Sequence, residues 1–232
     1  MHWEAPPRPA ELTETRIIEA ILDGHFPINS HLPAERDLAA QLGVTRPTLR
    51  EALQRMARDG WLEINHGKPT RVRDYWIEGS LGVLGAIALH QQNLPPEFVP
   101  NLLHVRLLLA PTYARLAAQR QPALVIRRLQ TNLALPDKST TYAQADFELH
   151  RQLTISSGNP VFTLILNGFE DLYLQMGKRY FSLAHARQHS RDFYRRLLEA
   201  VRRGNPEEVE SVTYTAIDHS RSLWEQAQQE AI

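Results

Sequence analysis

The most constraining feature of the sequence is a pair of short helical segments joined by a glycine. The first, residues 34–42, is amphipathic and is followed by Gly43, a residue type that readily ends a helix. The second begins at Thr45, which can cap it, and repeats apolar residues at helical spacing as far as about residue 59. Two helices joined by so short a turn predict a helix-turn-helix, whose second helix presents its first residues to the DNA major groove.

The segment after this pair alternates apolar and polar residues, as a strand with one buried face does. It covers residues 61–72 and contains the sequence HGKP, which suits a hairpin turn. A further helix is expected before the pair, over residues 12–22. Together these elements predict a winged helix-turn-helix DNA-binding domain over residues 1–74, with a small β-hairpin as its wing.

The rest of the chain shows helical periodicity and no convincing strand pattern. We expect a hinge at residues 75–80 and then an all-helical domain for effector binding and dimerisation over residues 81–232. The helices expected there cover residues 81–91, 96–119, 122–133, 140–157, 160–181, 187–203 and 206–229. The predicted fold is therefore mainly α, with an N-terminal winged helix-turn-helix and a C-terminal helical bundle.

Composition excludes several classes of protein. The chain has no cysteine, which removes disulfides, zinc–thiolate sites and thiol nucleophiles. No apolar run is long enough for a membrane span, and the first ten residues lack the apolar core of a secretory signal, so we expect a cytoplasmic protein without a membrane partner. A net charge of zero gives no indication for or against a nucleic-acid partner.

The stretch LPAERDLAAQLGVTRPTLREALQRMAR, residues 32–58, resembles the signature of the GntR family of bacterial regulators. The blocks NLLHVR and SSGNPVFTLILNG, with residues 172–181, are similar to the acyl-CoA-responsive regulators of fatty-acid metabolism within that family. The resemblance implies a homodimer that binds a palindromic double-stranded DNA operator when it is empty. It also implies release of the operator when a long-chain fatty acyl-CoA fills the helical domain, with no other cofactor.

The expected DNA contacts lie on the second helix of the pair, beside it and at the wing tip. Arginine is the commonest side chain to recognise guanine, and hydroxyl groups at a helix start favour phosphate. The residues that we expect to contact DNA are Arg36, Thr45, Arg46, Thr48, Arg50, His66, Gly67 and Lys68. For Arg55 and Arg58 we expect solvent-exposed or ion-paired side chains rather than DNA contacts. Pro47 stands where another threonine is expected from the resemblance, so the preferred operator could differ slightly.

The resemblance also assigns residues to the effector. These are Arg106, Tyr180, Tyr194, Ser220 and Trp224. Arg106 and Ser220 would make polar contacts with the thioester or pantetheine, while Tyr180 and Trp224 would line or gate the cavity, although such aromatic residues are often plain core. Ala216 and Ile217 replace a Tyr-Gly pair, and His150 replaces an aromatic residue, which leaves the preferred chain length open.

An alternative effector is a metal-bound small carboxylate. Many relatives with such a helical domain hold a divalent metal through an Asp and a His four residues apart and two later histidines. Asp146 and His150 have this spacing, but Tyr194 and Ala216 stand at the remaining positions, so we predict no metal site. Only a shifted alignment would bring in other imidazoles, namely those of His185, His189 or His219.

The sequence also bears on two other classes of protein, an enzyme and an adaptor. An enzyme is not expected, because the sequence has no phosphate-binding glycine loop, no nucleophile elbow and no complete metal set. An adaptor protein would not need the recognition-helix pattern. Sequence-specific DNA binding separates a regulator from an adaptor.

Overall fold

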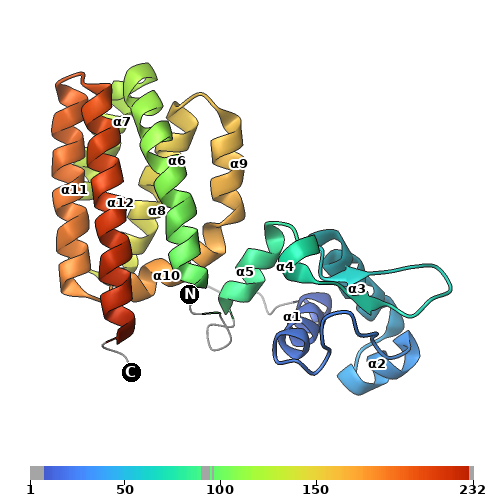
Figure 1. Cartoon of the computed structure of the whole chain (residues 1–232). Coiled ribbons are helices and arrows are strands. Elements are labelled where there is room, and N and C mark those ends of the chain that lie inside the picture. The colour runs from blue at the N-terminus through green and yellow to red at the C-terminus, as the bar shows by residue number, and fades with distance from the viewer. Residues whose placement is uncertain (1–7, 90–94, 96, 230–232) are drawn as a thin grey trace, which may run out of the picture. The chain divides into compact units, whose positions relative to one another are not determined.

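Contacts divide the computed structural model into two units, Met1–Leu94 and Pro95–Ile232, and each unit has its own core (Figure 1). The structure describes residues 8–89, 95 and 97–229. The predicted helix end at residue 91 and helix start at residue 96 lie outside these residues. Residues 75–80 belong to the first unit, and their role as a hinge remains a prediction.

The helices of the winged helix-turn-helix are α1 (Pro9–Leu22), α2 (Glu35–Leu42) and α3 (Arg46–Asp59). Gly43 ends α2 with a φ of 68°, and Gly60 ends α3 with a φ of 96°, a left-handed conformation that glycine adopts without steric cost. Both α1 and α2 pack against α3, whose buried face carries Leu49, Leu53 and Met56. The predicted helix-turn-helix is confirmed.

The wing is a hairpin of β1 (Leu62–Glu63) and β2 (Arg71–Val72), which pair antiparallel. Leu62 lies opposite Val72, and both side chains are buried, so the hairpin is held against the core of the first unit. The short helices α4 (Tyr75–Glu78) and α5 (Gly82–Leu89) follow. Glu78 of α4 pairs with Arg71 of β2 at 3.4 Å, which ties the predicted hinge segment to the wing.

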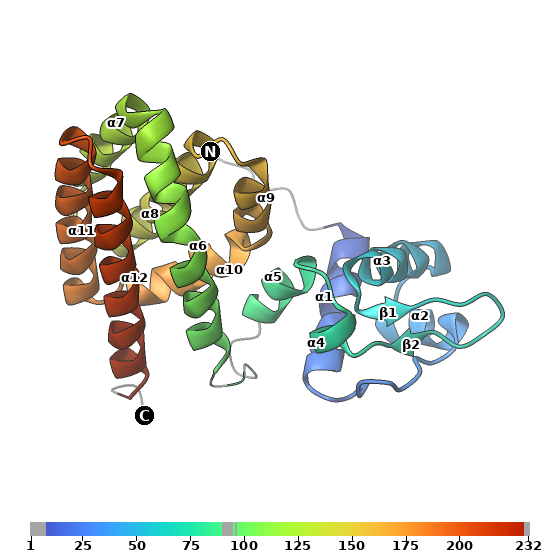
Figure 2. The same ribbon diagram turned by 45° about the horizontal axis from the view of Figure 1, so that its top comes forward.

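The second unit is a bundle of helices, as predicted. Its helices are α6 (Phe98–Arg120), α7 (Pro122–Leu133), α8 (Ser139–Ser156), α9 (Pro160–Gly168), α10 (Glu170–Tyr180), α11 (Ala184–Arg202) and α12 (Pro206–Gln229). Helix α8 packs against α6, α7, α9 and α10, while α12 packs against α6 and α11 (Figures 1 and 2). No helix in the described part of the chain is both long and apolar enough to cross a membrane.

One predicted helix is wrong. The sequence predicted a single helix over residues 160–181, but the structure has α9 and α10 with a break at Phe169. Phe169 has φ −103° and ψ 1°, and it follows Gly168, a poor helix former. After the break, α10 runs from the end of α9 toward α12 (Figure 2), and α9 and α10 both reach the cavity described below.

Candidate DNA-binding surface and effector cavity

The start of α3 presents hydroxyl groups and an arginine at the surface. Thr45 caps the helix, since its hydroxyl accepts the N–H of Thr48 at 3.4 Å, and the two hydroxyls lie 2.9 Å apart. Arg46 is in the first turn and is exposed. The free N–H groups of a helix start and this cation suit a phosphate or a base edge.

Two further arginines flank this helix start. Arg36 pairs with Asp37 at 2.9 Å, and its side chain is 76% exposed. Arg50 of α3 pairs with Glu35 of α2 at 2.7 Å and is 66% exposed. Ion pairs at such exposed sites contribute little to stability, so DNA phosphates can replace these partners at small cost.

At the wing tip, His66, Gly67 and Lys68 are all exposed. Gly67 has a φ of 73°, which allows the tight reversal, and the Lys68 N–H donates to the carbonyl of Asn65 at 3.2 Å. The structure thus brings the three predicted wing residues together on one turn. Their contact with DNA stays a prediction.

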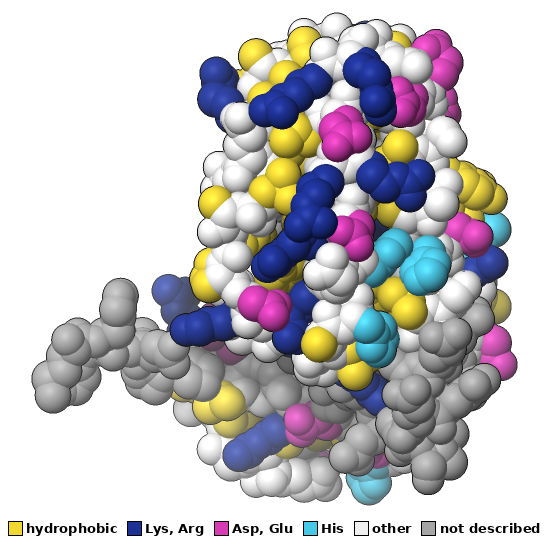
Figure 3. Space-filling view, turned by 90° about the vertical axis from the view of Figure 1, so that its left-hand side faces the viewer, with side chains coloured by type: hydrophobic (Ala, Val, Ile, Leu, Met, Phe, Trp, Pro, Cys, Tyr) yellow, Lys and Arg dark blue, Asp and Glu magenta, His cyan; other side chains and the backbone are white. Residues whose placement is uncertain are grey.

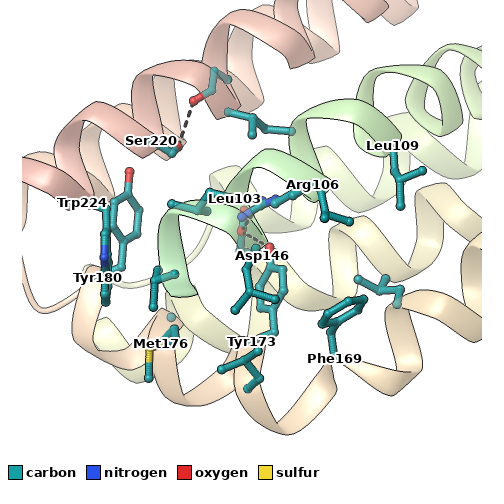
Figure 4. A pocket seen from close by; sticks show the side chains of 18 of the residues that line it. Leu103, Arg106, Leu109, Asp146, Phe169, Tyr173, Met176, Tyr180, Ser220 and Trp224 are labelled. Atoms are coloured by element: carbon teal, nitrogen blue, oxygen red, sulfur yellow. Dashed lines mark hydrogen bonds and ion pairs between the residues drawn. The ribbon is translucent and has the colours of Figure 1, made fainter. Parts of the chain in front are cut away.

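The second unit contains a cavity of about 150 Å³ that is partly open to solvent. Its walls are mostly apolar and come from α6, α9, α10, α11 and α12, with side chains such as Leu103, Leu109, Phe169 and Met176 (Figure 4). Four of the five predicted effector residues line it, namely Arg106, Tyr180, Ser220 and Trp224. The fifth, Tyr194, is fully buried and is not among the lining residues.

A network of buried polar groups borders the cavity around Asp146. One carboxylate oxygen, Oδ2, accepts from the Tyr173 hydroxyl at 2.6 Å and from Arg106 Nη2 at 3.1 Å. The other oxygen, Oδ1, accepts from the Tyr194 hydroxyl at 2.8 Å. Burial alone would raise the pKa of Asp146, but the charge of Arg106 and the hydrogen bonds from the two phenols outweigh it and lower the pKa. The carboxylate is therefore ionised inside the protein.

His150 continues the network as a neutral ring. Burial, and then the charge of Arg106, lower the pKa of His150 to about 3. Arg106 Nη2 lies 2.6 Å from Nε2 of His150, and because a guanidinium only donates, Nε2 accepts. The ring proton must then sit on Nδ1, which donates to the Tyr113 hydroxyl at 2.6 Å.

Two buried N–H groups in the cavity wall have no hydrogen-bond partner among the described residues. They are Nε of Arg106 and Nε1 of Trp224. Burial raises the pKa of Tyr180, a third polar lining residue, to about 12, so its hydroxyl keeps its proton. A buried donor without a partner carries a free-energy cost. An effector with acceptor oxygens would remove that cost.

The sequence did not point to every residue of this site. Tyr113 and Tyr173 hold the ends of the network, and Phe162 and Met176 line the cavity. Helix α9 has no fully buried position, and its apolar Val161 and Leu164 are exposed, so its sequence pattern did not single out Phe162 as a cavity residue.

Comparison with known families identifies both units. Residues 9–72 match the model of bacterial regulatory proteins of the gntR family, and residues 73–231 match the FadR C-terminal domain. The fatty acid metabolism regulator protein of Shewanella pealeana is 42% identical over 217 residues, which cover 94% of this chain and 91% of that protein. Its counterpart in Pectobacterium atrosepticum is 44% identical over 194 residues, or 84% and 81% of the two chains.

A solved structure supports the fold. Lar, described as controlling expression of the agr system of Listeria monocytogenes, superposes with a TM-score of 0.65 at 16% identity and covers 96% of this chain and 99% of its own. The two family matches together cover nearly the whole chain. The chain belongs to the gntR family of bacterial transcription regulators, in the group that carries a FadR C-terminal domain.

Proposed function

We propose that this regulator controls genes of fatty-acid metabolism from the cytoplasm, and that it binds a palindromic operator as a homodimer and leaves it when a long-chain acyl-CoA enters the cavity. The main support for an acyl-CoA effector is the apolar cavity, whose wall holds two N–H donors without a hydrogen-bond partner among the described residues. The relatives in Shewanella and Pectobacterium are named fatty acid metabolism regulators, which supports the same class of target gene.

The composition of the cavity wall favours an acyl chain over a small carboxylate. Burying a chain yields about 0.8 kcal/mol per methylene group, whereas a small carboxylate offers few apolar atoms to a wall of leucine, phenylalanine and methionine. Both oxygens of Asp146 already accept hydrogen bonds from Arg106, Tyr173 and Tyr194. A metal would have to displace these donors.

The size of the cavity indicates how effector binding changes the positions of the surrounding helices. At about 150 Å³ the cavity is smaller than the roughly 300–1,000 Å³ of typical ligand pockets, so we expect a long chain to widen it by parting the helices that surround it. A dimer reads two half-sites about one helical turn apart, and a shift of its recognition helices breaks that match. Parting of the helices would supply such a shift if the segment 75–80 transmits it.

Calorimetric titration of the purified protein without DNA tests the effector directly. Oleoyl-CoA should bind at one site per chain in the presence of a chelator, and butyryl-CoA should bind at least about 100-fold more weakly, because it buries far fewer methylene groups. Binding of citrate with manganese, together with no binding of oleoyl-CoA, would contradict the proposal.

A further inference from the structure

The buried polar network beside the cavity contains more hydrogen-bond donors than acceptors. Its acceptors are the two oxygens of Asp146, Nε2 of His150 and the hydroxyl oxygen of Tyr113, and each of them already receives a donor. Nε of Arg106 is left without a partner among the described residues. A group that enters the cavity must therefore bring acceptor oxygens if it is to satisfy the network.

The Tyr113 hydroxyl is a second surplus donor. It accepts from Nδ1 of His150 at 2.6 Å, because Nε2 of the same neutral ring accepts from Arg106. Its own proton has no acceptor among the described residues. Burial raises the pKa of Tyr113, so the hydroxyl keeps this proton. Tyr113 is 4% exposed and lines the cavity, which places a donor at the cavity wall where the described residues supply no acceptor.

The surroundings of the Tyr113 ring are apolar. The ring packs edge-on against Phe162 of α9 with centroids 5.8 Å apart, and Leu109, one turn earlier on α6, lines the same cavity. On the outer surface of the bundle, basic, acidic and histidine side chains are interspersed (Figure 3), and water serves polar groups in such positions. A donor among phenylalanine and leucine side chains has far less access to water, so an unmet hydrogen bond costs more there.

Tyr113 lies farther along α6 than Arg106. The two residues are seven positions apart on this helix, so their backbones are separated by about two helical turns, or roughly 10 Å. Figure 4 shows Arg106 between Ser220 and Trp224 on one side and Leu109 on the other. With the thioester beside Arg106 and Ser220, as the resemblance implies, the Tyr113 hydroxyl meets the middle of a long acyl chain.

We propose that the effector is an acyl-CoA whose chain carries a keto group near its middle, and that the Tyr113 hydroxyl donates to this oxygen. The inference rests on the proposed function, since it specifies the chain of the same effector. A keto oxygen only accepts hydrogen bonds, which is what a site with surplus donors requires. A hydroxyl group would bring another donor, and a carboxylate would bury a charge beside Arg106, a cation that is already paired with Asp146.

Calorimetry with the full chain tests the proposal by comparing stearoyl-CoA with three oxo derivatives. These carry the keto group at the eighth, tenth or twelfth carbon of the same chain. In a purely apolar cavity a keto group should weaken binding at least about tenfold, because it loses its hydrogen bonds to water. In the wild-type protein, at least one oxo derivative should instead bind as tightly as stearoyl-CoA or more tightly.

Tyr113→Phe removes the hydroxyl donor and keeps the ring. In this variant the ratio of the Kd for the favoured oxo derivative to the Kd for stearoyl-CoA should rise about tenfold. Tyr142→Phe is the matched control, since it removes the hydroxyl of another buried tyrosine, which does not line the cavity, and it should keep the wild-type ratio. Because Tyr113→Phe leaves the His150 N–H without its acceptor, the double variant Tyr113→Phe/His150→Phe is the second test and should show the same raised ratio.

Weaker binding of all three oxo derivatives than of stearoyl-CoA to the wild-type protein would overturn the inference and leave the proposed function intact. A Kd ratio that stays at the wild-type value in Tyr113→Phe and in the double variant would also overturn it, since the keto oxygen would then not contact Tyr113. If the wild-type protein binds none of these thioesters, the proposed function fails and the inference fails with it.

Discussion

Tyr194 of α11 donates its hydroxyl to Oδ1 of Asp146 on α8 over 2.8 Å, and both residues are buried. Tyr194 stands at a position where the sequence comparison with metal-binding relatives expected a histidine. The hydroxyl therefore satisfies one of the two carboxylate oxygens that a metal would need.

Tyr194→Phe should destabilise the helical unit by about 1–3 kcal/mol, because it leaves a buried carboxylate oxygen without its donor. Urea denaturation, monitored through the helical signal in circular dichroism, measures this loss. Tyr214→Phe is the matched control, since Tyr214 on α12 is 51% exposed and should change stability by less than about 0.5 kcal/mol. Equal stability of the two variants would show that this hydrogen bond contributes nothing.

The stability of the protein should fall as the pH is lowered from 7 to 5, and His150 should be a main cause. Its pKa is lowered from 6.5 to about 3, so the unfolded chain binds a proton that the folded protein excludes between these values. The stabilisation is complete above pH 6.5 and decreases by about 2 kcal/mol on going to pH 5. In His150→Gln this part of the pH dependence should vanish, and an unchanged slope would mean that His150 is protonated in the folded protein.

Arg46→Ala should weaken binding to the palindromic operator by about 1–3 kcal/mol, as expected for loss of one base contact, and should leave the Kd for oleoyl-CoA unchanged. Arg58→Ala, at the other end of the same helix, is the control and should reduce affinity much less. Fluorescence anisotropy with a labelled operator gives both values. Equal operator affinity for Arg46→Ala and wild type would remove Arg46 from the DNA-binding surface.

Filling the cavity should uncouple the effector from DNA. Met176→Trp places an indole where the acyl chain is proposed to lie, so oleoyl-CoA should no longer release the operator, although operator affinity persists. Met176→Leu conserves volume and should respond as the wild type does. Normal release of the operator from Met176→Trp would place the acyl chain outside this cavity.

Local signals in the sequence were sufficient for much of the fold. Thr45 marks the start of α3 and Gly60 marks its end. Helices α7 and α12 each begin with a proline, at the positions where the periodicity predicts them. The sequence analysis did not predict the break at Phe169. Apolar residues continue on both sides of it, and a helical pattern of apolar residues does not reveal a turn within such a run.

The polar network could not be predicted for a different reason. Tyr113, Asp146 and Tyr173 lie on three different helices, and only the packing of α6, α8 and α10 brings them together. Arg106 was expected beside the effector on the strength of the resemblance, but its pairing with Asp146 and His150 follows from this packing alone. Which of these groups contact a bound effector remains a prediction.

The most direct test of the proposed function is the release of the wild-type protein from a labelled fatty-acid-gene operator, followed by fluorescence anisotropy. Oleoyl-CoA is added in the presence of a chelator, and manganese with citrate is added in a parallel titration. We predict that oleoyl-CoA alone lowers the anisotropy to that of free DNA, while manganese with citrate has no effect. Release that requires the metal and the carboxylate, with no response to oleoyl-CoA, would contradict it.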